Sequence, residues 1–173
     1  MKKLFSTLSI KRFVVLLVIT VTVALFSGMG VANAAYHTGT SSSYTWTTSG
    51  YTYVNKSYIS SSAANSLYGT IAGDTYLSRN HASTSAGESA VRAYLVTMDE
   101  ATGDFTAVCG MSDWYRNPSY LGPSTGFSTR AGFYWTAVGK EFVCWGTSRV
   151  YDLTYHSYIH MNTYNTPIIP VEY

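Results

Sequence analysis

The stretch that decides the fold class is SSSYTWTTSGYTYVNKSYIS, at residues 41–60. Aromatic and hydroxyl side chains alternate on both sides of its Ser49-Gly50 pair. A period of two is typical of a strand with one buried face, and Tyr, Trp and Thr favour strands. The pattern therefore predicts strands near 43–48 and 51–58, joined by a turn at Ser49-Gly50.

Similar β patterns recur along the chain, separated by polar or Gly-containing segments. Further strands are predicted at 89–98, 105–112, 127–138, 141–148 and 149–164. Gly73-Asp74 predicts a two-residue hairpin turn between two short strands, and 60–68 is either one helical turn or a loop. No βαβ pattern or amphipathic helix is apparent. About eight strands at this spacing predict an all-β fold, an antiparallel sandwich or barrel.

The first 34 residues differ from the rest of the sequence. A basic start precedes the uncharged run Phe13–Phe26, and Ala32-Asn33-Ala34 follows. This order is typical of a secretory signal peptide. An uncleaved membrane anchor is the alternative, but the apolar core is short for a span. We expect residues 1–34 to be a signal peptide and 35–173 a single secreted β domain.

Cleavage would change the charge of the protein. The full chain has 11 basic and 9 acidic residues, for a net charge of +2. Four basic residues, Lys2, Lys3, Lys11 and Arg12, lie in the predicted signal. The remaining seven basic and nine acidic residues give −2, and the sequence of 35–173 has no basic run. We therefore expect no nucleic-acid partner.

The two cysteines, Cys109 and Cys144, both follow the predicted signal. An even cysteine count in an exported chain predicts a disulfide between them. That bond would close a loop of about 36 residues and stabilise the fold by roughly 3–4 kcal/mol.

Candidate catalytic groups are few. The GPSTG stretch at 122–126 matches the G-x-S-x-G pattern, but a nucleophile elbow needs a helix after it, and a β pattern follows. Asp152, His156 and His160 share one face of the predicted strand 149–164, where positions four apart are roughly 13 Å apart. His81 would have to come from a distant loop. No catalytic centre is predicted.

The long irregular stretch 113–126 carries the candidate ligand-binding residues, Trp114, Tyr115, Arg116 and Tyr120. Loops on rigid β scaffolds often bind ligands. Aromatic rings beside hydrogen-bonding groups suit a sugar ring, and they equally suit a membrane interface. The structural alternative is that Trp114 folds back as part of the core.

His37 gives the one metal hypothesis. If cleavage follows Ala34, His37 is the third residue of the mature chain. This arrangement resembles the amino-terminal copper and nickel motif, in which the free amine, two amide nitrogens and the imidazole form a square-planar set. No cofactor is otherwise predicted.

These patterns favour a secreted, non-enzymatic binding protein. The expected partner is a cell-envelope component, a glycan or a membrane surface. A secreted antimicrobial, bacteriocin-like or membrane-active protein is the alternative. A small extracellular hydrolase using Asp152 or His156 is the third hypothesis.

Overall fold

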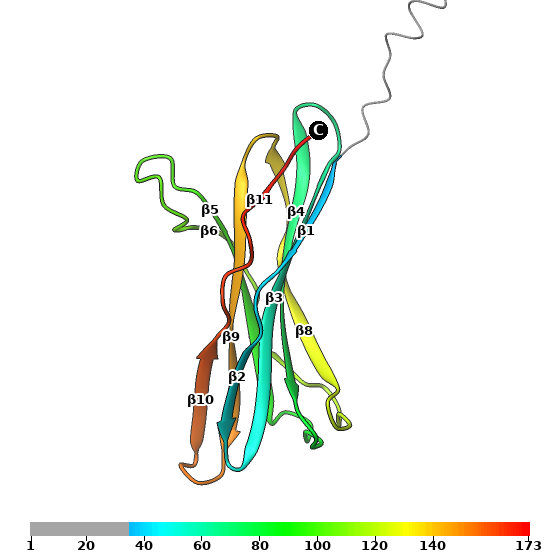
Figure 1. Ribbon diagram of the computed structural model, residues 1–173, viewed down its shortest axis with the longest axis vertical. Coiled ribbons are helices and arrows are strands. Elements are labelled where there is room, and N and C mark those ends of the chain that lie inside the picture. The colour runs from blue at the N-terminus through cyan, green and yellow to red at the C-terminus, as the bar shows by residue number, and fades with distance from the viewer. Residues whose placement is uncertain (1–34) are drawn as a thin grey trace, which may run out of the picture. The chain divides into compact units, whose positions relative to one another are not determined.

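The computed structural model describes residues 35–173, and the signal-peptide prediction for 1–34 lies outside the described residues. Every regular element of 35–173 is a β-strand, and the strands form two antiparallel sheets (Figure 1). No helix in this part of the chain is long and apolar enough to cross a membrane. The all-β prediction is confirmed, and of its two architectures the open two-sheet sandwich is the one observed.

The first sheet has the order β1-β3-β4-β8, with β2 also paired to β3. β1 pairs with residues 58–62 of β3, and β2 pairs with residues 51–55. Because β4 occupies the other side of β3, β1 and β2 share one edge. The bounds are β1 Tyr36–Thr40, β2 Tyr44–Thr48, β3 Tyr51–Ala63, β4 Tyr68–Arg79 and β8 Gly126–Ala137.

The second sheet has the order β10-β9-β5-β6. Two short strands pair with the same sheet outside this order. β11 pairs with the start of β9, and β7 pairs with the start of β5. The bounds are β5 Ser89–Thr97, β6 Ala107–Met111, β7 Tyr115–Arg116, β9 Glu141–Asp152, β10 Ser157–Asn162 and β11 Ile169–Pro170.

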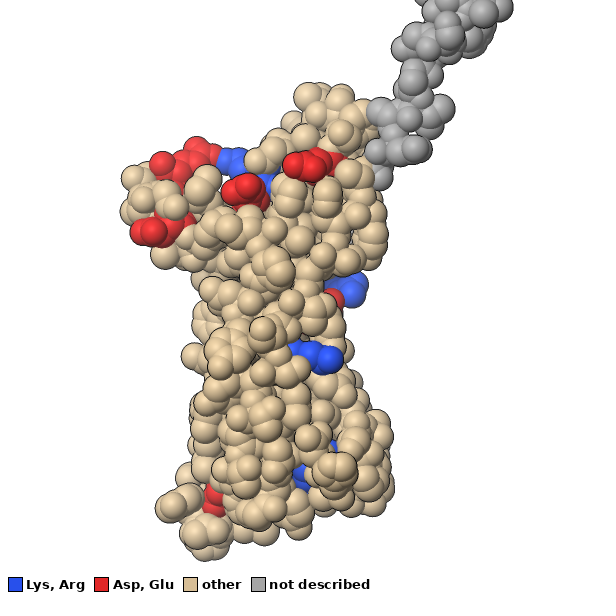
Figure 2. Space-filling model, viewed as in Figure 1, with Lys and Arg blue, Asp and Glu red and all other residues tan. Residues whose placement is uncertain are grey.

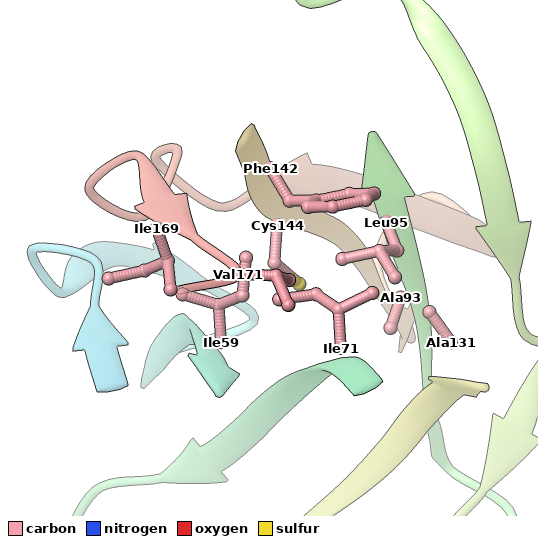
Figure 3. Close-up of a cluster of buried hydrophobic side chains, with 9 residues drawn as sticks. All are labelled: Ile59, Ile71, Ala93, Leu95, Ala131, Phe142, Cys144, Ile169 and Val171. Atoms are coloured by element: carbon pink, nitrogen blue, oxygen red, sulfur yellow. The ribbon is translucent and has the colours of Figure 1, made fainter. Parts of the chain in front are cut away.

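Two hydrophobic clusters fill the space between the sheets. The larger cluster contains Ile59, Ile71, Ala93, Leu95, Ala131, Phe142, Cys144, Ile169 and Val171 (Figure 3). The smaller contains Trp46, Tyr53, Leu77, Val91 and Val150. Burying these apolar side chains is the main favourable contribution to folding.

A buried polar layer separates the two clusters. Along β3, Asn55 and Ser57 lie between Tyr53 of the smaller cluster and Ile59 of the larger one. The Asn55 amide donates to the Ser148 hydroxyl at 3.3 Å, and the Ser57 and Thr163 hydroxyls are 2.8 Å apart. These hydrogen bonds offset the cost of removing the polar groups from water.

The hairpin predicted from residues 41–60 is confirmed. β2 and β3 pair in register on either side of Ser49-Gly50. Ser49 has φ 48° and Gly50 has φ 76°, so both turn residues adopt positive φ. Two such residues in succession match the strong right-handed twist of a two-residue hairpin. β3 continues to Ala63, so the 60–68 segment is mostly strand, with its turn at 64–67.

The hairpin predicted at Gly73-Asp74 is wrong, because β4 passes straight through it. A Cβ atom on Gly73 would lie 2.7 Å from the Cys144 sulfur of the opposite sheet. The glycine therefore permits a close approach between the sheets. The pairing of β4 with β8 also shifts register between Ala72 and Asp74.

The single strand predicted at 149–164 is also wrong. β9 ends at Asp152, a turn follows, and β10 runs back beside β9. The Asp152 carboxylate closes this turn by accepting hydrogen bonds from the backbone N–H groups of Thr154 at 2.7 Å and Tyr155 at 3.0 Å. A side chain thus makes a turn in a stretch without Gly or Pro.

The predicted disulfide is wrong as well, since Cys109 and Cys144 are free thiols. Cys144 in β9 pairs opposite Leu95 in β5, and β5 separates β9 from β6. Two strand spacings place the cysteines' strands roughly 9.5 Å apart, beyond the range of about 7 Å that a disulfide spans between Cα atoms. Cys109 is the extra residue of a bulge, and its thiol donates to the Leu95 carbonyl at 3.3 Å.

Candidate functional site

The outer face of the second sheet carries a row of side chains that runs directly across four strands. His160 in β10 pairs with Arg149 in β9, and Arg149 pairs with Ala90 in β5. On its other side Ala90 pairs with Arg116 in β7. Directly paired residues point to the same face of a sheet. The row is therefore His160, Arg149, Ala90 and Arg116.

Strand alternation places this row on the outside. Val91 and Ala93 of β5 are buried in the core, so Ala90 and Arg92 point the other way. The same argument applies in β9, where Val150 is buried and Arg149 faces outward. Arg92 therefore stands beside the row, two positions along β5 from Ala90.

Trp114 lies against this face and contacts Arg149, Arg92 and His160. The guanidinium carbon of Arg149 is 4.3 Å from the centroid of the Trp114 ring, and that of Arg92 is 5.0 Å away. The His160 ring meets Trp114 edge-on at 5.5 Å. Such cation–π contacts hold an arginine over an aromatic ring.

Tyr158 supports the other side of the cluster. The guanidinium carbon of Arg149 lies 4.9 Å from its ring centroid, and that of Arg116 lies 6.0 Å away. Tyr151 packs edge-on against Tyr158 at 5.4 Å. We call the set Arg92, Trp114, Arg116, Arg149, Tyr158 and His160 the arginine–aromatic surface.

The positive charges of this surface have no carboxylate partners among residues 35–173. The ion pairs found there involve His37, Arg79, Arg130 and Lys140. The Nε atoms of Arg92 and Arg149 are buried without a hydrogen-bond partner. Burial lowers the pKa of Arg149, and so does the positive charge of Arg116 and of Arg92. The surface is thus an uncompensated concentration of cations.

A groove adjoins this surface at His160. It has a volume of about 520 Å³ and is lined by Tyr44, His160, Met161, Asn162, Thr163 and Tyr164. The Tyr44 and Tyr164 rings meet edge-on at 5.5 Å. The groove thus combines aromatic rings with amide, hydroxyl and imidazole groups, the mixture that an oligosaccharide needs for stacking and hydrogen bonding.

The structure brings together two of the four candidate ligand-binding residues of the 113–126 stretch. Trp114 and Arg116 belong to the arginine–aromatic surface. Tyr115 points away from it, since its ring lies 6.2 Å from that of Phe127 in the other sheet. Tyr120 is 67% exposed and makes none of the aromatic contacts of the surface.

Buried Asn117 holds this loop in place. Its side-chain carbonyl accepts from the backbone N–H of Ser89 at 3.1 Å, and its amide donates to the Ser85 carbonyl at 2.7 Å. The loop is therefore anchored just beyond Trp114 and Arg116.

No family model matches the chain, and neither a curated protein nor a solved structure matches it.

The residues of the hydrolase hypothesis serve structural purposes. Asp152 is buried, and its carboxylate accepts hydrogen bonds from Thr48 and from its own turn. His156 occupies that turn at φ 50°. In the GPSTG stretch, Ser124 lies in a turn at φ 60° and its hydroxyl accepts from the backbone N–H of His81, while strand β8 follows.

His37 lies in β1, opposite Ser61, and its Nε2 atom is 3.3 Å from a Glu172 carboxylate oxygen. Residues 35–173 contain no group of three or more His, Cys, Asp or Glu side chains arranged to hold a metal ion. The amino-terminal copper or nickel hypothesis depends on a chain that begins at Ala35, and it stays a prediction.

A second cavity, of about 460 Å³, lies beside the β5–β6 hairpin and is lined in part by Cys109, Tyr134, Trp135 and Phe142. Acidic side chains gather over this hairpin (Figure 2). Lys140 in the cavity wall is already paired with Glu100. The lining of this cavity therefore has no unpaired cation of the kind found on the arginine–aromatic surface.

Proposed function

We propose that the protein is a secreted, non-enzymatic binding protein that acts at a cell-envelope or glycan surface. The observation that carries the proposal is the Trp114 ring, held by Arg149 and His160 at the side of an aromatic and polar groove. A half-buried aromatic ring on a rigid sheet can stack on a sugar while neighbouring groups donate and accept hydrogen bonds.

The test is binding of the purified 35–173 protein to insoluble cell-wall material and to a glycan array. Trp114→Ala is expected to reduce binding at least tenfold. The matched control is Trp135→Ala, because Trp135 is a 67%-exposed tryptophan on β8 of the other sheet. Thermal melts of both variants separate lost binding from lost folding. Failure of the unaltered protein to bind any of these materials would reject the proposal.

A membrane-active protein is the second candidate, and one observation favours it. Leu67, Tyr68 and Trp135 are 67%, 52% and 67% exposed, and all lie near the β3–β4 turn. Thr70 pairs with Trp135, which places Tyr68 and Trp135 on the same face of the first sheet. Exposed aliphatic and aromatic groups of this kind suit a bilayer interface.

Dye leakage from vesicles of mixed zwitterionic and anionic phospholipid distinguishes the two candidates. A membrane-active protein would release dye, and Trp135→Ala rather than Trp114→Ala would reduce that release. The absence of leakage, together with binding to cell-wall material, would leave the envelope-binding proposal alone.

A further inference from the structure

The strand order alone places the three arginines of the arginine–aromatic surface on the same face of the sheet. Arg149 and Arg116 both pair with Ala90, one from each side of β5. Neighbouring strands are about 5 Å apart, so the backbones of Arg149 and Arg116 are roughly 9.5 Å apart, within reach of two long side chains that extend over Ala90. Arg92 adds a third cation from the same face of β5. Burial lowers the pKa of Arg149, and the positive charges of Arg116 and Arg92 lower it further.

The arginine and lysine residues elsewhere in 35–173 are differently placed. Arg79 pairs with Glu88, Arg130 with Asp74 and Lys140 with Glu100. Lys56 lies alone over the rings of Tyr58 and Tyr76, 5.3 and 5.5 Å from their centroids. Only at Arg92, Arg116 and Arg149 do several unpaired cations gather, and two of them bury an Nε that has no acceptor.

A guanidinium binds an anionic group through the edge of its plane. The planar fork matches the two oxygens of a carboxylate and also fits sulfate and phosphate. The guanidinium carbon of Arg149 lies 4.3 Å from the Trp114 ring centroid, and that of Arg116 lies 6.0 Å from the Tyr158 ring centroid. Contact with a ring leaves Nη–H donors of a guanidinium able to bind a ligand. An anion with several acceptor oxygens therefore matches the donors of this surface.

We propose that the ligand of the arginine–aromatic surface is an acidic glycan, whose carboxylate or sulfate groups are bound by Arg92, Arg116 and Arg149. This inference rests on the proposed function and specifies the chemistry of its ligand. Sugar rings of such a glycan would lie in the adjoining groove against Tyr44 and Tyr164, where His160 and Asn162 supply hydrogen-bonding groups. The net charge of −2 for residues 35–173 does not oppose this, because a local cluster sets the local field.

A nucleic acid fits the same geometry less well. A nucleic-acid backbone presents a continuous track of phosphates, along which a binding protein can make about six to ten contacts. The cations here are gathered at one point, and the acidic residues Asp99, Glu100 and Asp104 lie in the β5–β6 hairpin of the same sheet. A glycan with spaced acidic groups needs only the one cluster together with the groove.

The test measures binding of the 35–173 protein to four probes by calorimetry: polygalacturonate, heparin, neutral dextran and a single-stranded oligonucleotide. We expect polygalacturonate or heparin to bind at least tenfold more tightly than dextran and the oligonucleotide, with an affinity that falls as salt rises. Polygalacturonate carries only carboxylates and heparin carries both carboxylates and sulfates, so binding to heparin but not to polygalacturonate would show that sulfate is required.

Three variants locate the binding. Arg116→Gln is expected to weaken acidic-glycan binding about tenfold, the loss expected for one charged hydrogen bond. Arg149→Lys keeps the charge but removes the fork, and it should also weaken binding. Lys56→Gln removes one positive charge from the other sheet and should leave binding unchanged. Because Arg116 is exposed, its substitution leaves the core intact.

The outcomes separate the two proposals. Equal affinity for dextran and the acidic glycans would overturn the acidic-ligand inference and leave envelope binding in place. No binding to any glycan or to cell-wall material would overturn both. Tightest binding to the oligonucleotide, or an equal effect of Lys56→Gln and Arg116→Gln, would reject a specific acidic-glycan site.

Discussion

The carboxylate of Asp152 in β9 accepts a hydrogen bond from the hydroxyl of Thr48 in β2, and this contact joins the two sheets. The same carboxylate closes the β9–β10 turn through the backbone N–H groups of Thr154 and Tyr155. One buried acid therefore fixes both the turn that leads into β10 and the end of the β2–β3 hairpin. His160 and Tyr158 of the candidate site lie on β10, so their placement depends on it.

Acid titration should reveal this role of Asp152. The hydrogen bond from Thr48 and those from the turn lower the pKa of Asp152 to about 2. A group with a lowered folded-state pKa stabilises the protein above its unfolded pKa of about 4, and this contribution is lost as pH falls toward 2. Asp152→Asn should lower Tm at neutral pH, and the difference from the unaltered protein should shrink below about pH 4.

Asp104→Asn provides the control for this measurement, since Asp104 is exposed in the β5–β6 hairpin. It should leave Tm unchanged across the same pH range. If the Tm difference caused by Asp152→Asn stayed constant down to pH 2, the carboxylate charge would not be what stabilises the turn.

The free thiols predict a fold that is insensitive to reducing agents. Burial raises the pKa of Cys144 to about 12 and also raises the pKa of Cys109, so both sulfurs remain protonated near neutral pH. We expect two thiols per denatured chain, slow alkylation of the native protein, and the same Tm with and without dithiothreitol. An intact mass two hydrogens lighter, with a Tm that drops on reduction, would contradict the strand arrangement around β5.

Gly73→Ala tests the close approach of the two sheets. The added methyl group would lie 2.7 Å from the Cys144 sulfur and 3.0 Å from its Cβ atom. Overpacking of this kind costs about 1–3 kcal/mol in the free energy of unfolding, measurable by urea denaturation. Gly122→Ala is the matched control, because the nearest atom to its added Cβ is the Thr125 hydroxyl at an ordinary 3.7 Å. Equal stability of the two variants would refute the packing argument.

The arginine–aromatic surface should lower the stability of the unliganded protein. Arg116 repels Arg149, and its distance of 6.0 Å from Tyr158 is at the limit of a cation–π contact. Arg116→Gln should therefore stabilise the free protein by a few tenths of a kcal/mol, an effect that salt screening reduces. A thermal melt at low and high salt measures this. A lower Tm for Arg116→Gln at low salt would show that Arg116 contributes to the fold.

Local signals in the sequence were enough for part of the fold. The β2–β3 hairpin follows from alternation around Ser49-Gly50, and β5 follows from the pattern at 89–98, because both patterns report directly on which face is buried. The turn after Asp152 was missed because LTYH at 153–156 has no Gly or Pro and continues the alternation. The hairpin prediction at Gly73-Asp74 was wrong because glycine suits a tight turn and a close contact between sheets equally.

Only part of the candidate site could be predicted from the sequence, for a related reason. Trp114 and Arg116 are neighbours in a loop whose composition already indicates binding. Arg92 and Arg149 join them through the order β9-β5-β7, which alternation within one strand does not specify. The disulfide prediction was wrong for the same reason, because the sequence does not specify the strand order. β5 lies between the strands that carry Cys109 and Cys144.

The polar layer at Asn55 and Ser57 divides the interior into parts of unequal size, and the smaller cluster, with Val91 and Val150, lies beneath the arginine–aromatic surface. Hydrogen exchange should therefore differ between the two ends of the sandwich. Amides around Val91 and Val150 are expected to open at a lower free energy than those around Leu95 and Cys144. The end that carries the candidate site is then expected to open first, while the other end stays folded.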